Sequence, residues 1–146
     1  MLCRTYGENR FDFIHERQLI GSVSDHANFY KNVYSSLKPG GWFELVEMEA
    51  KSFSDDGTLK SDAALVRWGQ WIEEAFGKIG RPFLPIERYK ELMEDTGFVN
   101  VKLRMVKRPM NDWPKDPRQK EIGKVRARVR TKLESRLMIA ATVLLS

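Results

Sequence analysis

The sequence predicts an α/β fold with a parallel sheet, because two strand signals are separated by one helical segment. The first strand signal is Phe-Asp-Phe-Ile-His at 11–15, and the second is the apolar stretch 41–49. A strand, a crossover helix and a second strand form the unit from which parallel sheets are built. With 146 residues, of which 42% are hydrophobic, the chain is long enough to form the core of one domain.

The crossover helix is expected to begin at Ser24 or Asp25, either of which can cap it, and to end near Leu37. Its predicted buried stripe has helical spacing and is flanked by two tyrosines: Phe29, Val33 and Leu37, with Tyr30 and Tyr34 beside them. A Pro39-Gly40-Gly41 turn then ends the helix. The strand that follows is apolar on both faces, with Phe43 and Leu45 pointing one way and Glu47 falling in the same alternation. That pattern predicts an interior strand covered by helices on both sides.

The remaining elements follow from periodicity and from turn residues. A helix is expected from a cap at Ser61 or Asp62 to about Ile79, and another over 86–95 between Pro85 and the stop at Gly97. The segment 98–106 alternates like a strand near the edge of a sheet. A helix over 120–136 would bury a narrow stripe of Val125, Val129 and Leu133, and 137–145 is either a strand or a helix end.

Charge divides the chain into two parts. Residues 107–146 carry 11 Lys and Arg against 4 Asp and Glu, whereas residues 1–106 carry 14 against 16. We therefore expect a first domain over 1–108 and a basic C-terminal helix and tail over 109–146. One cysteine excludes an internal disulfide. The first residues lack the apolar run of a signal peptide, and 137–145 is far shorter than the roughly 20 residues that span a bilayer. We expect an intracellular protein, cytoplasmic or nuclear, without membrane contact.

Three short sequence motifs resemble those of a known family. They are Phe-Asp-Phe-Ile-His-Glu-Arg at 11–17, Gly-Ser-Val-Ser-Asp at 21–25, and Leu-Lys-Pro-Gly-Gly-Trp-Phe-Glu at 37–44. They resemble the fourth strand, fourth helix and fifth strand of class I S-adenosylmethionine-dependent methyltransferases, in the group of fungal secondary-metabolism regulators. The resemblance covers about residues 10–123. It implies an incomplete Rossmann-like methyltransferase sheet, formed from strand four onward, with helices on both faces.

The resemblance places His15, Glu16, Arg17 and Gln18 beside the methionine or adenine portion of S-adenosylmethionine. The alternative is that His15 and Arg17 bond nearby backbone groups while Glu16 is solvated. The family's glycine-rich cofactor turn has no counterpart, since the sequence contains no Gly-x-Gly. We therefore expect the C-terminal half of a methyltransferase domain, truncated and weak or inactive by itself.

No metal site is expected from two histidines on different elements. The strand carboxylates Glu44, Glu47 and Glu49 are expected to emerge into solvent rather than form an acid–base pair. The methyl acceptor is not identified by any residue pattern.

Two other functions stay open. The basic helix, through Arg126, Arg128 and Arg130, suits a non-catalytic regulatory module that binds nucleic acid or another acidic partner, including a protein. A truncated gene product without a function of its own is the third possibility.

Overall fold

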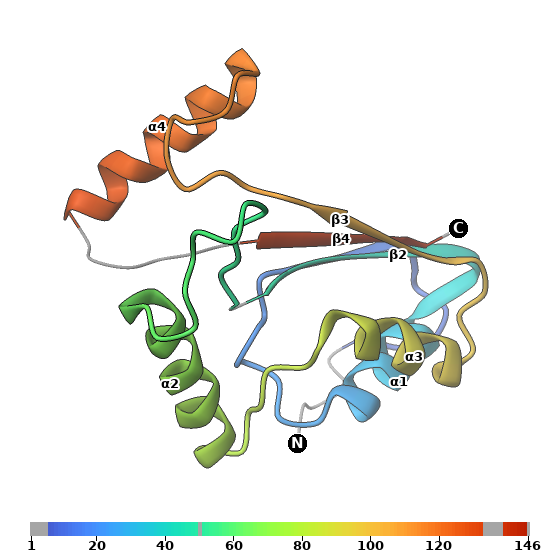
Figure 1. Ribbon diagram of the computed structural model, residues 1–146. Coiled ribbons are helices and arrows are strands. Elements are labelled where there is room, and N and C mark those ends of the chain that lie inside the picture. Colours follow the sequence, from blue (N-terminus) through green and yellow to red (C-terminus); the bar gives the residue numbers. More distant parts are fainter. Residues whose placement is uncertain (1–5, 50, 133–138, 146) are drawn as a thin grey trace.

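The computed structural model describes residues 6–49, 51–132 and 139–145. Four helices and four strands are present in that part of the chain (Figure 1). In chain order they are β1 (Phe11–Arg17), α1 (His26–Ser36), β2 (Leu37–Glu49), α2 (Ala64–Lys78), α3 (Ile86–Thr96), β3 (Val101–Val106), α4 (Pro117–Lys132) and β4 (Ile139–Leu145).

The four strands form one sheet in the order β1-β2-β4-β3. Strands β1 and β2 are parallel, which confirms the predicted crossover unit, and β4 runs antiparallel to both β2 and β3. Strand β3 lies at an edge, as its alternating pattern predicts. The segment 137–145 forms a strand over Ile139–Leu145, and it lies between β2 and β3 rather than apart from the sheet. The predicted boundary at 108/109 stays a prediction.

Helix α1 begins as expected, because Oδ1 of Asp25 accepts the backbone N–H of Asn28 at 3.0 Å. The predicted Pro-Gly-Gly turn, in contrast, is a bulge inside β2. Phe11 pairs with Leu37 and Phe13 with Trp42, so β2 has extra residues between the two pairs. At Gly41 a Cβ would meet the carbonyl oxygen of Lys38 at 2.9 Å, so the bulge needs glycine there.

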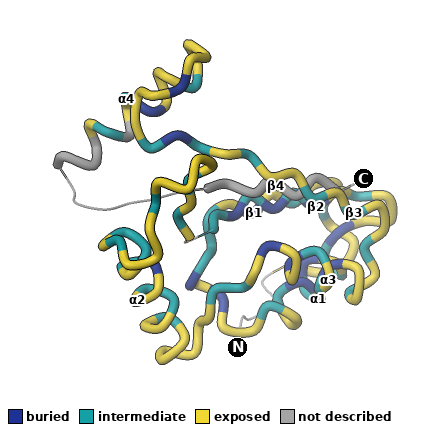
Figure 2. The backbone as a smooth tube through the Cα atoms, in the orientation of Figure 1, coloured by how far each residue is buried: buried dark blue, intermediate teal, exposed yellow. Residues whose placement is uncertain are grey.

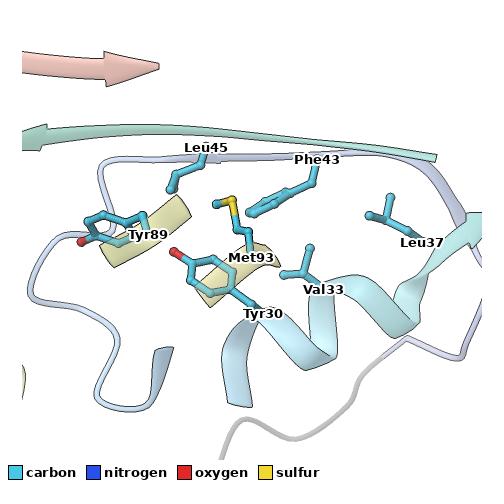
Figure 3. Close-up of a cluster of buried hydrophobic side chains, with 7 residues drawn as sticks. All are labelled: Tyr30, Val33, Leu37, Phe43, Leu45, Tyr89 and Met93. Atoms are coloured by element: carbon cyan, nitrogen blue, oxygen red, sulfur yellow. The ribbon is translucent and has the colours of Figure 1, made fainter. Parts of the chain in front are cut away.

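The core lies between the sheet and the two helices α1 and α3 (Figure 3). Its buried side chains come from both helices and from β2: Tyr30, Val33, Leu37, Phe43, Leu45, Tyr89 and Met93. Val33 and Leu37 are buried as predicted. Tyr30 was expected beside the stripe, yet it is fully buried at the centre, whereas Phe29 is only partly buried.

The opposite face of the sheet is different. Phe13 and Trp42, which pair across β1 and β2, are 54% and 48% exposed. Helices α1 and α3 lie side by side on the other face (Figures 1 and 2). Within the described residues, the expected helical cover is therefore present on one face only.

Helix α2 packs against a loop of the chain. A Cβ at Gly21, in the loop between β1 and α1, would meet the Phe76 ring of α2 at 2.3 Å, so ring and backbone are in close contact. The expected caps Ser61 and Asp62 are wrong, because the N-cap residue is Ala63, which makes no side-chain cap. Trp71 of this helix is exposed.

The last two helices show opposite degrees of burial. Helix α3 follows Pro85 and ends at Gly97, whose φ of 114° is left-handed, as predicted. Helix α4 begins earlier than expected, and Val125 of its predicted stripe is exposed. The side chain of Val129 and the whole of Leu133 lie outside the described residues. Within the described ranges, no helix has both the length and the apolar character needed to cross a membrane.

Candidate functional site

The four residues proposed from the sequence lie at the carboxyl end of β1. Strand alternation separates them: His15 and Arg17 lie on the open face, whereas Glu16 is turned toward α1 and the core. Gln18 ends the strand with a φ of 57°, and its N–H donates to the carbonyl of Val46 at 2.9 Å. The four side chains do not converge on one cleft, and their role beside a cofactor stays a prediction.

His15 makes a side-chain contact on the open face. Its Nδ1 lies 2.8 Å from Oε2 of Glu44, its neighbour on β2. Glu44 is therefore partnered and half-buried, and not the free solvent carboxylate that was expected. The histidine bonds a carboxylate here, rather than the nearby backbone group that the alternative interpretation required.

Glu16 is buried, with only 6% of its surface exposed. The expectation of a solvated Glu16 is therefore wrong. Burial, and after it the nearby charge of Glu47, raise the pKa of this carboxyl to about 8. At neutral pH, Glu16 holds its proton.

For Glu47, the predicted side of β2 is confirmed, but the predicted exposure to solvent is wrong. It was expected to reach solvent, but it is 2% exposed on the same face as Phe43 and Leu45. Its Oε1 accepts the N–H of Leu19 at 2.6 Å, and its Oε2 accepts the N–H of Met48 at 3.2 Å. Burial raises the pKa of Glu47, and these backbone hydrogen bonds oppose that rise. The unbroken alternation after Phe43 was the available signal.

Tyr30 and Tyr89 lie near the two carboxyls, and the ring of His26 contacts both tyrosine rings. The hydroxyl of Tyr30 and both ring nitrogens of His26 are buried without a hydrogen-bond partner among the described residues, as is Oε2 of Glu16. Burial, then the charge of Glu16, raises the pKa of the Tyr30 hydroxyl, while burial lowers the pKa of His26. We name Glu16, Glu47, Tyr30 and Tyr89 the buried carboxyl cluster.

The buried carboxyl cluster keeps a proton on Glu16 up to about pH 8. It lies inside the core, so the side chains that cover it separate it from any substrate at the surface. Within the described residues there is no group of three or more His, Cys, Asp or Glu arranged to hold a metal ion.

Known proteins resemble this chain over most of its length. A family model described as a methyltransferase domain matches residues 4–103. The secondary metabolism regulator LAE1 of Cochliobolus heterostrophus is 37% identical over 121 residues, which are 82% of this chain and 39% of that protein. Methyltransferase pytC of Aspergillus terreus is 38% identical over 113 residues, 77% of this chain and 35% of its own length.

Solved structures share the fold. Phosphoethanolamine N-methyltransferase 2 of Haemonchus contortus, in complex with S-adenosyl-L-methionine, has a TM-score of 0.58 at 14% identity, covering 97% of this chain and 34% of that one. The trans-methyltransferase CalH, in complex with SAH, has a TM-score of 0.50 at 14% identity and covers 98% and 32%. The chain spans at most 39% of the length of the two curated relatives described above. With a family model matched over residues 4–103, this chain belongs to the S-adenosylmethionine-dependent methyltransferase family.

Proposed function

We propose that this chain forms the C-terminal half of a methyltransferase domain and contributes the acceptor side of its active site. The observation that carries the proposal is the strand order β1-β2-β4-β3. Strand β1 lies at the edge of this sheet, and it contains the first of the three motifs shared with the family, residues 11–17. An edge strand with a free row of backbone groups is suited to pairing with a further strand. The limited coverage of the longer relatives supports the same assignment.

The residues present do not fit S-adenosylmethionine by themselves. His15 and Arg17 lie on an open sheet face, and Glu16 is turned away into the core. The sequence has no Gly-x-Gly turn that would let the backbone approach a nucleoside closely. We infer that cofactor binding requires residues beyond these 146, and we assign no catalytic step to this chain.

The family reaction needs mainly alignment of its two reactants. This half of the domain is proposed to shape the site in which they align and not to supply acid–base groups. Glu16 has the proton affinity of a general base but is covered by the core. We therefore assign the buried carboxyl cluster a structural role.

Calorimetry with S-adenosylmethionine tests the proposal on two proteins. The 146-residue chain alone is expected to show no tight, saturable binding. A fusion that places the upstream part of the Cochliobolus relative before this chain is expected to bind the cofactor, and that upstream part alone is the control. Tight binding by the chain alone, or a folded fusion that binds no cofactor, would contradict the proposal.

The exposed helix α4 favours a second candidate function, binding to an acidic partner. Ile122 and Val125 are exposed along this basic helix, so these two apolar side chains are not docked on the sheet. Binding of a duplex DNA oligonucleotide that weakens steeply with salt would support this function. Replacing Arg126, Arg128 and Arg130 with Gln should then abolish the binding. Retention of binding in that variant would exclude the helix as the site.

A further inference from the structure

Two segments far apart in sequence enclose a pocket at one end of the sheet. The first follows β2 and the second follows β3, and both leave the sheet at the same end because β2 and β3 run in the same direction (Figure 1). The pocket has a volume of about 650 Å³ and lies between residues 52–65 and 107–119. Pockets that bind small molecules usually have volumes of roughly 300–1,000 Å³.

The walls of this pocket are mainly apolar. Leu59, Leu65 and Met110 line it in half-buried positions. Two aromatic side chains stand at its border with much of their surface exposed: Phe53 at 50% and Trp113 at 70%. Exposed rings on the wall of a pocket of this size can stack on the flat faces of a ligand.

The charged side chains around the pocket differ in whether they have a partner. Lys107 donates to Oδ1 of Asp55 at 2.5 Å and lies 5.6 Å from the centre of the Phe53 ring. Asp56 accepts hydrogen bonds from the backbone N–H and the hydroxyl of Thr58, so both acids have donors. Arg108 also lines the pocket and is half-buried, and in the described part of the chain it has no salt bridge.

A half-buried guanidinium beside apolar walls favours an anionic group, because its fork of donors matches a carboxylate. We propose that this pocket binds a flat, aromatic small molecule that carries one carboxylate. The rings of Phe53 and Trp113 contact its faces, and Arg108 binds its acidic group. The proposal that a ligand binds here depends only on the pocket. The identification of that ligand as the methyl acceptor rests on the proposed function.

Calorimetry with 2-naphthoate, without S-adenosylmethionine, tests the binding site. We expect one saturable site for 2-naphthoate and binding at least tenfold weaker for 2-naphthylmethanol, which has the same rings but no charge. Trp113→Ala should weaken 2-naphthoate binding at least tenfold. Trp71→Ala, which removes a tryptophan of similar exposure away from the pocket, should leave binding within twofold.

Arg108→Gln tests the charged contact separately. It should reduce 2-naphthoate binding to the level of the alcohol while leaving alcohol binding unchanged, whereas Arg104→Gln on β3 should change neither. Phe53→Ala supplies a second ring variant if Trp113→Ala alters the fold by circular dichroism. Absence of saturable binding, equal affinity for acid and alcohol, or equal loss in the Trp71 and Trp113 variants would overturn the proposal. Because no cofactor is present, these results are independent of the cofactor-binding test.

Discussion

The two faces of the sheet have opposite environments although their residues alternate along the same strands. Phe43 faces α1 and α3 and is completely buried, whereas its neighbour Trp42 is half exposed on the other face. On β1, Glu16 is buried among aromatic rings while His15 pairs with Glu44 near solvent. The difference shows that one covered face provides the core, so adjacent residues of similar size should differ widely in their effect on stability.

The largest expected difference is between Phe43→Ala and Trp42→Ala. Removing the buried ring should lower the free energy of unfolding by about 3–5 kcal/mol, because it leaves a cavity among Tyr30, Leu45 and Met93. Removing the half-exposed indole should cost about 1 kcal/mol or less. Urea unfolding measures both, and similar losses would mean that the open face is covered in solution.

A second comparison concerns pH. Because the pKa of Glu16 is raised to about 8 in the folded protein, the folded state binds its proton more tightly than the unfolded state does. The stabilisation that comes from protonated Glu16 is therefore complete below about pH 4.5 and is lost as the pH rises toward 8. Over that range the free energy of unfolding falls by up to about 1.4 kcal/mol per pH unit. Glu16→Gln should remove this loss and be more stable than the parent at pH 8.

The difference in unfolding free energy between parent and Glu16→Gln isolates this effect. The lowered pKa of His26 gives a trend of opposite sign, but it is common to both proteins and cancels. Glu87→Gln, at an exposed position on α3, serves as the surface control, and it should differ from the parent much less than Glu16→Gln does. A difference that does not grow between pH 5 and pH 8 would show that Glu16 is ionised or exposed.

The contact between α2 and the loop after β1 should have a smaller effect. Gly21→Ala places a methyl against Phe76 at a φ of +72°, and should cost about 1–3 kcal/mol. Gly77→Ala, one residue after Phe76, meets no atom within 4 Å and should be neutral or stabilising by up to about 1 kcal/mol. Thermal melts compare the two, and an unchanged melting temperature for Gly21→Ala would mean that α2 is not docked there.

The smallest energetic effect is expected at the open edge. Phe13→Lys should change the free energy of unfolding little, because this ring is 54% exposed, but it should reduce self-association through β1. Light scattering over a concentration series measures the self-association. Phe43→Lys is unsuitable as a control because it disrupts the core. Trp71→Lys is the matched exposed control. A monodisperse parent protein would show that the edge is already protected.

The elements fixed by local chemistry were predictable from sequence. The Asp25 cap and the Gly97 stop depend on one or two residues each, and both were confirmed. The βαβ unit followed from periodicity. The bulge at Gly41 was not predictable, because the same residues also form turns and only the pairing with β1 separates the two outcomes.

The candidate sites were harder to predict because they depend on contacts between distant segments. Glutamate is usually a surface residue, so residue type alone predicts that Glu16 and Glu47 are exposed. They are buried because helices cover their face of the sheet. The pocket brings 52–65 beside 107–119, a proximity that no periodicity signals. The place of β4 between β2 and β3 is non-local in the same way.

The position of β4 also has a consequence for synthesis on the ribosome. Strand β4 follows β3 in sequence yet pairs with both β2 and β3, so neither strand can gain that partner until 139–145 has left the exit tunnel. Until then, the emerging chain presents unpaired edges on β2 and β3, and late non-local pairing of this kind favours slow folding and capture by chaperones. A ribosome stalled before Ile139 would hold a half-sheet with its centre missing.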